Sequence, residues 1–403
     1  MRTLLQINSV VNSGSTGRIA EEIGQTAISQ GWESYIAYGR NKRLSQSQLI
    51  KIGTDWDIKM HGLQTRLFDR HGLGSKSATQ IFIKQIEAIK PDIIHLHNIH
   101  GYYLNIEVLF NFLASTQIPV LWTLHDCWPF TGHCVHFDFV GCKKWLTQCN
   151  NCPQTRTYPA SFFLDRSTQN FNLKKELFTG VHNLTLVPVS QWLANLLRQS
   201  FLKNLPIQVI NNGIDIETFK PVPSNNLRFK FKLQSKFIII GVANIWSEHK
   251  GLKDIIELSS KLDANYQIIL VGLSKKQIKT LPGNIIGIER TESVNELAEF
   301  YAASDVFINP TWEDNFPTTN IEALACGIPV ITYNTGGSIE SISKETGIIV
   351  EKGNIDDLFE AIRIIKNKGK YYYSKTCTER ARMLYNKNDR FKAYFDLYDT
   401  ILK

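Results

Sequence analysis

The stretch PTWEDNFPTTNIEALACGIPVI, residues 310–331, predicts a loop, a short helix and a strand in quick succession. Pro317 is typical of the first position of a helix, and the run from Ile328 to Thr332 is typical of a buried strand. The first amides of a helix carry a positive partial charge and attract anionic ligands. Two acids, Asp314 and Glu322, nevertheless flank this helix start, so their own partners must be explained.

The pattern of strand followed by helix extends over the whole chain and is typical of α/β proteins with parallel sheets. The predicted strands are 3–10, 34–38, 92–96, 119–124, 184–189 and 207–210, then 236–243, 266–271, 284–288, 305–309, 328–332 and 347–350. The predicted helices are 19–30, 79–90, 251–262, 293–303, 317–326 and 387–401. We therefore expect two Rossmann-like, doubly wound lobes that face each other across a cleft.

The boundary between the lobes is predicted just after residue 210, where a turn-rich segment is followed by the linker-like KPVPSNN at 220–226. The predicted domains are 1–210, which includes a cysteine-rich loop at 127–152, and 211–385. A final helix, 386–403, has an aromatic face. The pattern leaves its partner open between the core of the second lobe and a return to the first.

Composition narrows the class of protein. The 403 residues suffice for two or three domains, and the contents of 43% apolar and 20% charged residues are those of a globular chain. No apolar run reaches the roughly 18 residues of a membrane span. The opening MRTLLQINSVV predicts a first strand, not a signal peptide, so we expect a cytoplasmic protein. The net charge of +8 suits a nucleic acid, an anionic membrane surface or a phosphorylated ligand equally well, but simple solubility is the favoured explanation. No nucleic-acid-binding signature is present.

Candidate binding residues follow the ends of predicted strands. Gly14 and Gly17, in the loop after the first strand, would let backbone amides approach a ligand, although an ordinary turn explains them equally well. His125, followed by Asp126, ends the strand PVLWTL and is a candidate catalytic residue. Lys250 opens a helix after the strand at 236–243, where its charge could bind a phosphate or simply be solvated.

The helix start at Phe316, Pro317 and Thr318 gives an answer to the question of the two acids. Free amides there would bind a diphosphate. Glu322, one turn further, would accept hydrogen bonds from a ribose, and Asp314 from a hexose. The acids would thus bind the two sugars on either side of the phosphates.

Cysteines concentrate in one loop. Cys134, Cys142, Cys149 and Cys152 are spaced x7, x6 and x2, and five of the seven cysteines lie within 127–152. Stable disulfides are disfavoured in the cytoplasm, so a structural zinc site is one interpretation. Reduced cysteines packed in a loop are the other, and the spacing does not decide between them.

The motifs together resemble retaining glycosyltransferases of the GT-B fold, family four. The resemblance rests on the E-x7-E-like pattern in WEDNFPTTNIEALACGIPV, with HD at 125–126, NNGIDIETFKP at 211–221 and KG at 250–251 in the family's order. It covers nearly the whole chain. The WEDNFP form and the cysteine-rich loop are similar to a subgroup acting in capsule, exopolysaccharide or O-antigen assembly, such as colanic acid transferases.

The resemblance implies roles for individual residues. Glu322 matches the glutamate that binds the nucleotide ribose, and Asp314 matches the donor-sugar glutamate with one methylene fewer. Lys250 matches half of a phosphate clamp, whereas the arginine position holds Asn244. His125 is implied to lie beside the transferred sugar. The Gly14 to Gly17 loop is implied to approach donor and acceptor, and the final helix to cross back to the first lobe.

The resemblance implies transfer of a sugar from a nucleoside diphosphate to a glycan or lipid-linked acceptor, without a catalytic metal ion. Lipid-linked acceptors would bring the basic first lobe to the inner membrane surface. Three alternatives stay open: a sugar-nucleotide 2-epimerase, a two-lobed solute-binding protein, and an inactive scaffold suggested by Asn244 and Asp314.

Overall fold

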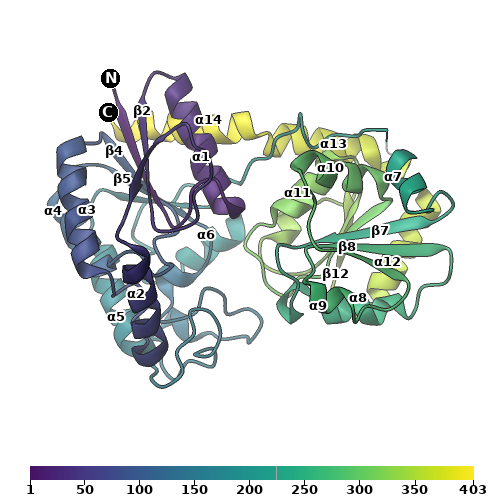
Figure 1. The fold of residues 1–403 in the computed structure, drawn as a ribbon, viewed down its shortest axis with the longest axis horizontal. Helices are drawn as coiled ribbons and strands as arrows, with labels where there is room; N and C mark the ends of the chain where they lie inside the picture. Colours follow the sequence, from purple (N-terminus) through teal and green to yellow (C-terminus); the bar gives the residue numbers. More distant parts are fainter. Residues whose placement is uncertain (224) are drawn as a thin grey trace. The chain divides into compact units, whose positions relative to one another are not determined.

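The computed structural model describes residues 1–223 and 225–403. The chain divides into two compact units, Met1–Asn211 with Phe391–Lys403, and Asn212–Arg390. Figure 1 shows one sheet with surrounding helices in each unit. Ser224, which belongs to the predicted linker 220–226, lies outside the described residues.

The first unit is built on a six-stranded parallel sheet in the order β3-β2-β1-β4-β5-β6. Its strands are β1 (Thr3–Asn8), β2 (Glu33–Tyr38), β3 (Gln48–Lys51), β4 (Ile93–Leu96), β5 (Val120–Leu124) and β6 (Leu184–Pro188). Its helices are α1 (Gly14–Ser29), α2 (Asp55–Phe68), α3 (Lys76–Ile89), α4 (Ile106–Ser115), α5 (Ser167–Thr179) and α6 (Gln191–Leu197), with the 3-10 turns η1 (Trp128–Phe130) and η2 (Lys144–Leu146).

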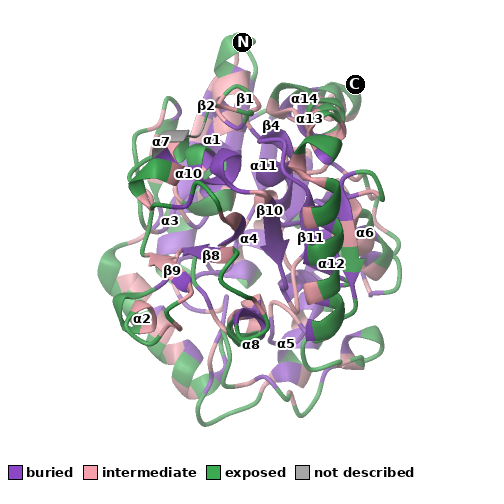
Figure 2. Cartoon of the chain, turned by 90° about the vertical axis from the view of Figure 1, so that its right-hand side faces the viewer, coloured by how far each residue is buried: buried purple, intermediate pink, exposed green. Residues whose placement is uncertain are grey.

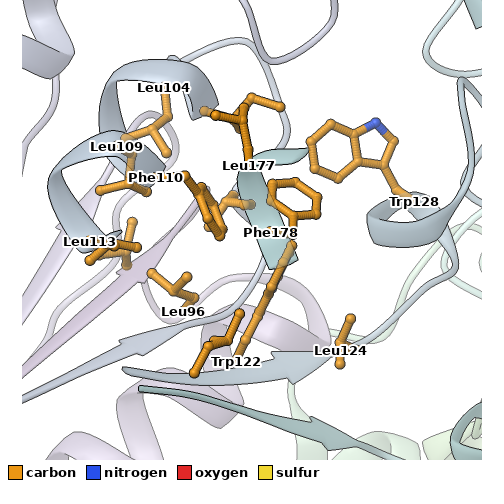
Figure 3. Close-up of a cluster of buried hydrophobic side chains, with 14 of the residues drawn as sticks. Leu96, Leu104, Leu109, Phe110, Leu113, Trp122, Leu124, Trp128, Leu177 and Phe178 are labelled. Atoms are coloured by element: carbon orange, nitrogen blue, oxygen red, sulfur yellow. The ribbon is translucent and has the colours of Figure 1, made fainter. Parts of the chain in front are cut away.

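Both faces of this sheet are covered. On one face, α4 and α5 pack on alternate strand residues; Figure 3 shows Phe110 and Phe178 beside Trp122, with ring centroids 4.4 Å apart for the two phenylalanines. On the other face lie α1 and the part of α14 (Lys387–Ile401) from Phe391 onward, around Leu4 and Ile93. Burial on both faces explains why these strands are continuous apolar runs.

The second unit repeats the architecture with the strand order β12-β11-β10-β7-β8-β9, again parallel. Its strands are β7 (Phe237–Val242), β8 (Tyr266–Val271), β9 (Ile285–Ile288), β10 (Val306–Asn309), β11 (Val330–Tyr333) and β12 (Gly347–Val350). Its helices are α7 (Asn225–Lys230), α8 (Leu252–Ser259), α9 (Lys275–Ile278), α10 (Val294–Ala303), α11 (Thr318–Ala325), α12 (Ile355–Lys368) and α13 (Lys370–Tyr385), with η3 (Glu248–Lys250) and η4 (Ser338–Ser341). Figure 2 shows β10 and β11 buried and the outer side of α12 exposed.

Two strand assignments differ from the sequence expectations. The predicted strand at 207–210 is wrong: this segment runs beside β6 but makes only an isolated bridge, from Ile207 to Leu186. The hydrogen-bond ladder between this segment and β6 is interrupted because Pro188 of β6 has no N–H to donate. The edge strand β3 was not predicted, since it is short and only partly buried. Among the described residues, no helix is long and apolar enough to cross a membrane.

Candidate active site

Each sheet has a point where its strand order reverses. In the second unit this point lies between β7 and β10, because β8 and β9 continue on one side and β11 and β12 on the other. In the first unit it lies between β1 and β4. Ligands of doubly wound sheets bind beyond the carboxyl ends of the strands at such a point. The loops that leave these strands therefore define the candidate site in each unit.

One ion pair and one histidine–carboxylate hydrogen bond connect the loops after β7 and β10. Lys250 Nζ lies 2.6 Å from Asp314 Oδ2, with side chains 36% and 20% exposed. His249 Nδ1 lies 2.8 Å from Glu313 Oε1. The backbone N–H of Trp312 also donates to the His249 carbonyl at 2.9 Å. The structure thus brings Lys250 and Asp314 together and adds a second pair that the sequence did not predict.

The backbone of Asp314 is fixed by a glycine turn. Gly337 N–H donates to the Asp314 carbonyl at 3.2 Å. Gly336 has a φ of 49°, and a Cβ at that position would lie 1.9 Å from the same carbonyl oxygen. The Asp314 carboxylate also accepts the N–H of Phe316 at 3.2 Å. Only glycine fits at 336, so this turn holds the carboxylate toward Lys250.

Helix α11 begins directly after this loop, with Pro317 at its N-cap. Proline has no side-chain acceptor, so it leaves the first amides, including that of Thr318, uncapped by its own side chain. Phe316 anchors the turn by packing on Tyr385, with ring centroids 5.6 Å apart. Asn320 anchors the helix itself, since its Oδ1 accepts from Asn309 Nδ2 at 2.8 Å. The positive end of α11 therefore lies on the same loop as Asp314.

Glu322 lies in the second turn of α11 and is only 5% exposed. Its Oε2 accepts a hydrogen bond from the hydroxyl of Tyr301 at 3.1 Å. The sequence did not identify Tyr301, because it precedes Glu322 by 21 residues on a separate helix. Asn244, the predicted second member of the clamp, is exposed and takes part in neither the Lys250–Asp314 nor the His249–Glu313 contact.

In the first unit, the two predicted glycines fill different roles. Gly14 has a φ of 64°, and a Cβ there would meet open space. A Cβ on Gly17 would instead lie 3.0 Å from Val10 Cγ2 and 3.2 Å from the Asn12 nitrogen. Gly17 therefore lets α1 pack against its own loop, whereas the backbone at Gly14 is open to a ligand.

His125, at the end of β5, is half-buried, and its Nε2 lies 3.5 Å from His97 Nδ1. Burial lowers the pKa of His125 to about 4, with Asp126 opposing this effect. The ring is thus held neutral near pH 7, which suits a group that contacts a sugar hydroxyl. His95 and His97 are buried core histidines.

Asp126 forms a hydrogen-bonded pair with His100. Its Oδ2 lies 2.7 Å from His100 Nε2. Burial would raise the pKa of Asp126, but the charge of His100 and their hydrogen bond outweigh it and hold the pKa below the ordinary value.

Models of known protein families match both halves of the chain. Residues 16–218 match the model described as Glycosyltransferase Family 4, and residues 223–384 match the model described as Glycosyl transferases group 1. Over 99% of this chain and 100% of its own length, "Putative colanic acid biosynthesis glycosyl transferase WcaC" of Escherichia coli (strain K12) is 24% identical. A UDP-Gal:alpha-D-GlcNAc-diphosphoundecaprenol alpha-1,3-galactosyltransferase of Escherichia coli is 25% identical over 50% of this chain and 56% of its own.

Solved structures show the same fold. Sucrose-phosphate synthase from Thermosynechococcus elongatus matches with a TM-score of 0.74 and 17% identity, over 100% of this chain and 99% of its own. Anabaena HepE in complex with UDP-glucose matches with a TM-score of 0.70 and 14% identity, over 99% and 100%. The two Rossmann-like units are therefore those of the GT-B fold. Since the family 4 model alone matches half of the chain, this protein is a glycosyltransferase that belongs to Glycosyltransferase Family 4.

Proposed function

We propose that this enzyme transfers a sugar from a nucleoside diphosphate to a hydroxyl of a glycan or lipid-linked acceptor, with retention at the anomeric carbon. The observation that carries the proposal is the Lys250–Asp314 pair beside the start of α11, at the switch point of the second sheet. The relatives' names support a role in bacterial surface polysaccharide biosynthesis, such as colanic acid or undecaprenol-linked glycans. The UDP and UDP-glucose complexes of Anabaena HepE support a nucleotide-sugar donor.

Each group has a role in the departure of the nucleotide. The diphosphate would lie at the start of α11, where Lys250 would exchange Asp314 for a phosphate oxygen. Asp314, released from the ion pair, would accept hydrogen bonds from the donor sugar. Glu322 would accept them from the ribose, with Tyr301 holding its second oxygen. Positive charge would then stabilise the leaving group as the bond from the anomeric carbon to the phosphate oxygen breaks.

The acceptor would attack from the face that the phosphate leaves. Its oxygen forms the new bond to the anomeric carbon, and its hydroxyl proton passes to the departing phosphate. Neutral His125 and the backbone at Gly14 would orient the sugar and the acceptor. The proposal requires no catalytic metal ion, because Lys250 and the helix amides supply the positive charge that the diphosphate needs.

Nucleotide binding tests the donor site directly. We expect one of UDP, GDP, ADP, CMP and TDP to raise the thermal unfolding midpoint, because a ligand at about 100 times its Kd adds about 2.7 kcal/mol of stability. Lys250→Ala and Glu322→Ala should lose the shift. Lys253→Ala removes an exposed lysine from the neighbouring helix and serves as the matched control. If none of the nucleotides shifts the midpoint, the chain has no functional donor site.

A lipid-linked acceptor would lie in a membrane, so the enzyme needs a surface that contacts the membrane. The candidate surface is formed by α2 and the loop after Tyr158. We call this the aromatic-basic face; it consists of Trp56, Lys59, Met60, Leu63 and Arg66 on α2, and Phe162, Phe163 and Leu164. Trp56 and Phe163 are 69% and 74% exposed, and Phe162 N–H donates to the Arg66 carbonyl, which joins the two segments. Exposed aromatic residues interleaved with cations suit an anionic lipid surface.

Vesicle flotation tests this contact. We expect the enzyme to float with vesicles of phosphatidylcholine and phosphatidylglycerol, and less with phosphatidylcholine alone. Removing the charges of Lys59 and Arg66 should weaken binding by about 1 kcal/mol each, and Trp56→Ser should weaken it further. Tyr371→Ser, at a residue that is 90% exposed in the second unit, is the control. Flotation that is independent of anionic lipid would refute the proposed face.

A further inference from the structure

The loop between β5 and α5 is long, and its only helical segments among the described residues are the short turns η1 and η2. It is held by a small core in which Trp145 packs between Phe130 and Phe137, with ring centroids 5.3 and 5.0 Å away. Lys174 of α5 is buried beneath it, and its Nζ donates to the carbonyls of Trp128 and Thr131 at 2.8 and 3.1 Å. A loop of this length without regular structure usually needs such additional anchors.

One small cavity lies inside this loop, with a volume of about 10 Å³. Four cysteines, Cys134, Cys142, Cys149 and Cys152, line it together with His133. A volume of this size admits a single small guest such as a water molecule or an ion. The cavity therefore gathers five side chains whose sulfur or nitrogen atoms are metal ligands in other proteins.

The sulfur atoms have the environment of ligands. The Cys134 and Cys152 side chains hydrogen-bond to each other, which places two sulfurs in contact. Cys149 Sγ accepts the backbone N–H of Gly132 at 3.2 Å, and Cys152 accepts a backbone hydrogen bond from Gln154. These contacts hold three of the four cysteine sulfur atoms at the wall of the cavity.

His133 supplies an independent observation. Its Nδ1 lies 2.6 Å from Asp69 Oδ1, and neither side chain is exposed. The other oxygen of Asp69 accepts the N–H of Arg166 at 2.8 Å. His133 Nε2 is buried and has no hydrogen-bond partner among the described residues. A histidine backed by a carboxylate through one nitrogen, with the other nitrogen buried and unpaired, is the usual arrangement of a metal-binding histidine.

We propose that this cavity binds a structural zinc ion through Cys134, Cys149, Cys152 and His133 Nε2. Thiolate and imidazole ligands in a closed four-coordinate site select zinc. Three thiolates would give the site a net negative charge, and the buried amine of Lys174 lies close enough to interact electrostatically with Cys149 and Cys134. Cys142, which also lines the cavity and interacts electrostatically with Cys149, is the alternative fourth ligand.

Among the described residues, no three histidine, cysteine or acidic side chains already meet as a ready metal site. Binding would therefore require the cysteine side chains to rotate toward the cavity centre. Such an adjustment is expected where metal binding and the ordering of a loop are coupled. The proposal concerns the stability of this loop and does not depend on the identity of the donor or acceptor.

The test is the metal content of the full chain purified without chelator. We expect about one zinc ion per chain, and tetrahedral thiolate-type absorption after replacement of zinc by cobalt(II). Cys149→Ser and His133→Gln should lose the metal, and Asp69→Asn should weaken zinc affinity about 10- to 100-fold. Cys142→Ser is the matched variant within the cavity and should keep it, as should Cys377→Ser in the second unit.

Three outcomes would overturn the proposal. If the wild-type protein is purified without bound zinc and has seven free thiols, the cysteines are simply reduced and packed in a loop. A Cys134–Cys152 disulfide found by mass spectrometry would show a redox pair instead. If Cys142→Ser loses the metal and His133→Gln keeps it, the fourth ligand is Cys142 and not His133. Since the wild-type metal content is measured directly, a variant that fails to fold does not affect the decision.

Discussion

Replacement of Lys250 by alanine is expected to lower kcat about 100- to 1,000-fold, the effect of removing one preorganised positive group from a developing anion. Lys250 is held at 2.6 Å from Asp314 across two loops whose backbones are also joined. Its ammonium is therefore in place before the leaving group acquires charge. The measurement is steady-state turnover with the nucleotide sugar identified by the thermal titration, at saturating donor.

The ion pair allows a sharper test than the single substitution. If Lys250 and Asp314 act on different parts of the donor, as proposed, Asp314→Asn should lower kcat while leaving nucleotide affinity within a fewfold of wild type. Lys250→Ala should weaken both. Lys253→Ala should change neither, because that side chain lies exposed on α8. Turnover of Lys250→Ala close to that of wild type would exclude Lys250 from the reaction.

Much of the fold was predictable because buried parallel strands are continuous apolar runs. The predicted strand 266–271 coincides with β8, which lies between β7 and β9 in its sheet. By contrast, β3 is an edge strand with the partly exposed sequence QLIK, which gives no apolar run to detect. The segment at 207–210 has the apolar run, but the prediction failed because its neighbour Pro188 cannot continue the ladder.

The candidate site was predictable in its residue types but not in its contacts. The helix signal at Pro317 and the position of Lys250 after a strand are local features of the sequence. The contact between Lys250 and Asp314 joins residues 64 apart, and no local spacing encodes it. The partners of the two flanking acids in this structure are accordingly Lys250 and Tyr301, and binding of sugars by those acids stays a prediction.

The second large effect that we expect is a loss of folding stability in mild acid. Five histidines of the first unit have pKa values lowered chiefly by burial: His61 and His125 to about 4, His95 to about 3, and His71 and His97 well below the ordinary value of 6.5. In the unfolded chain these groups bind protons below about pH 6.5, whereas in the folded chain they remain neutral. The unfolded state then binds more protons, so the free energy of unfolding falls as pH falls.

His95 shows why the folded state resists protonation. Its Nε2 and Nδ1 lie 2.7 Å from Thr123 Oγ1 and 2.6 Å from Tyr398 Oη. Thr123 donates its own hydrogen to Tyr394, so it accepts from His95 Nε2–H. Nδ1 is then left to accept from Tyr398. Thr123 and Tyr398 are not acids, so a second proton on His95 would find no anion there and would break the contact that joins α14 to the sheet.

Each such histidine contributes a slope of up to about 1.4 kcal/mol per pH unit, starting near pH 6.5 and ending at its folded pKa. Summed over several histidines, the stability lost between about pH 6.5 and pH 5 is a large part of a typical folding free energy. Urea unfolding at about pH 7.5, 6 and 5 measures it, with His95→Gln expected to flatten the slope. His182→Gln, at an exposed position, should leave the slope unchanged. A free energy of unfolding that stays constant from neutral pH to pH 5 would mean that these histidines are not kept neutral by the fold.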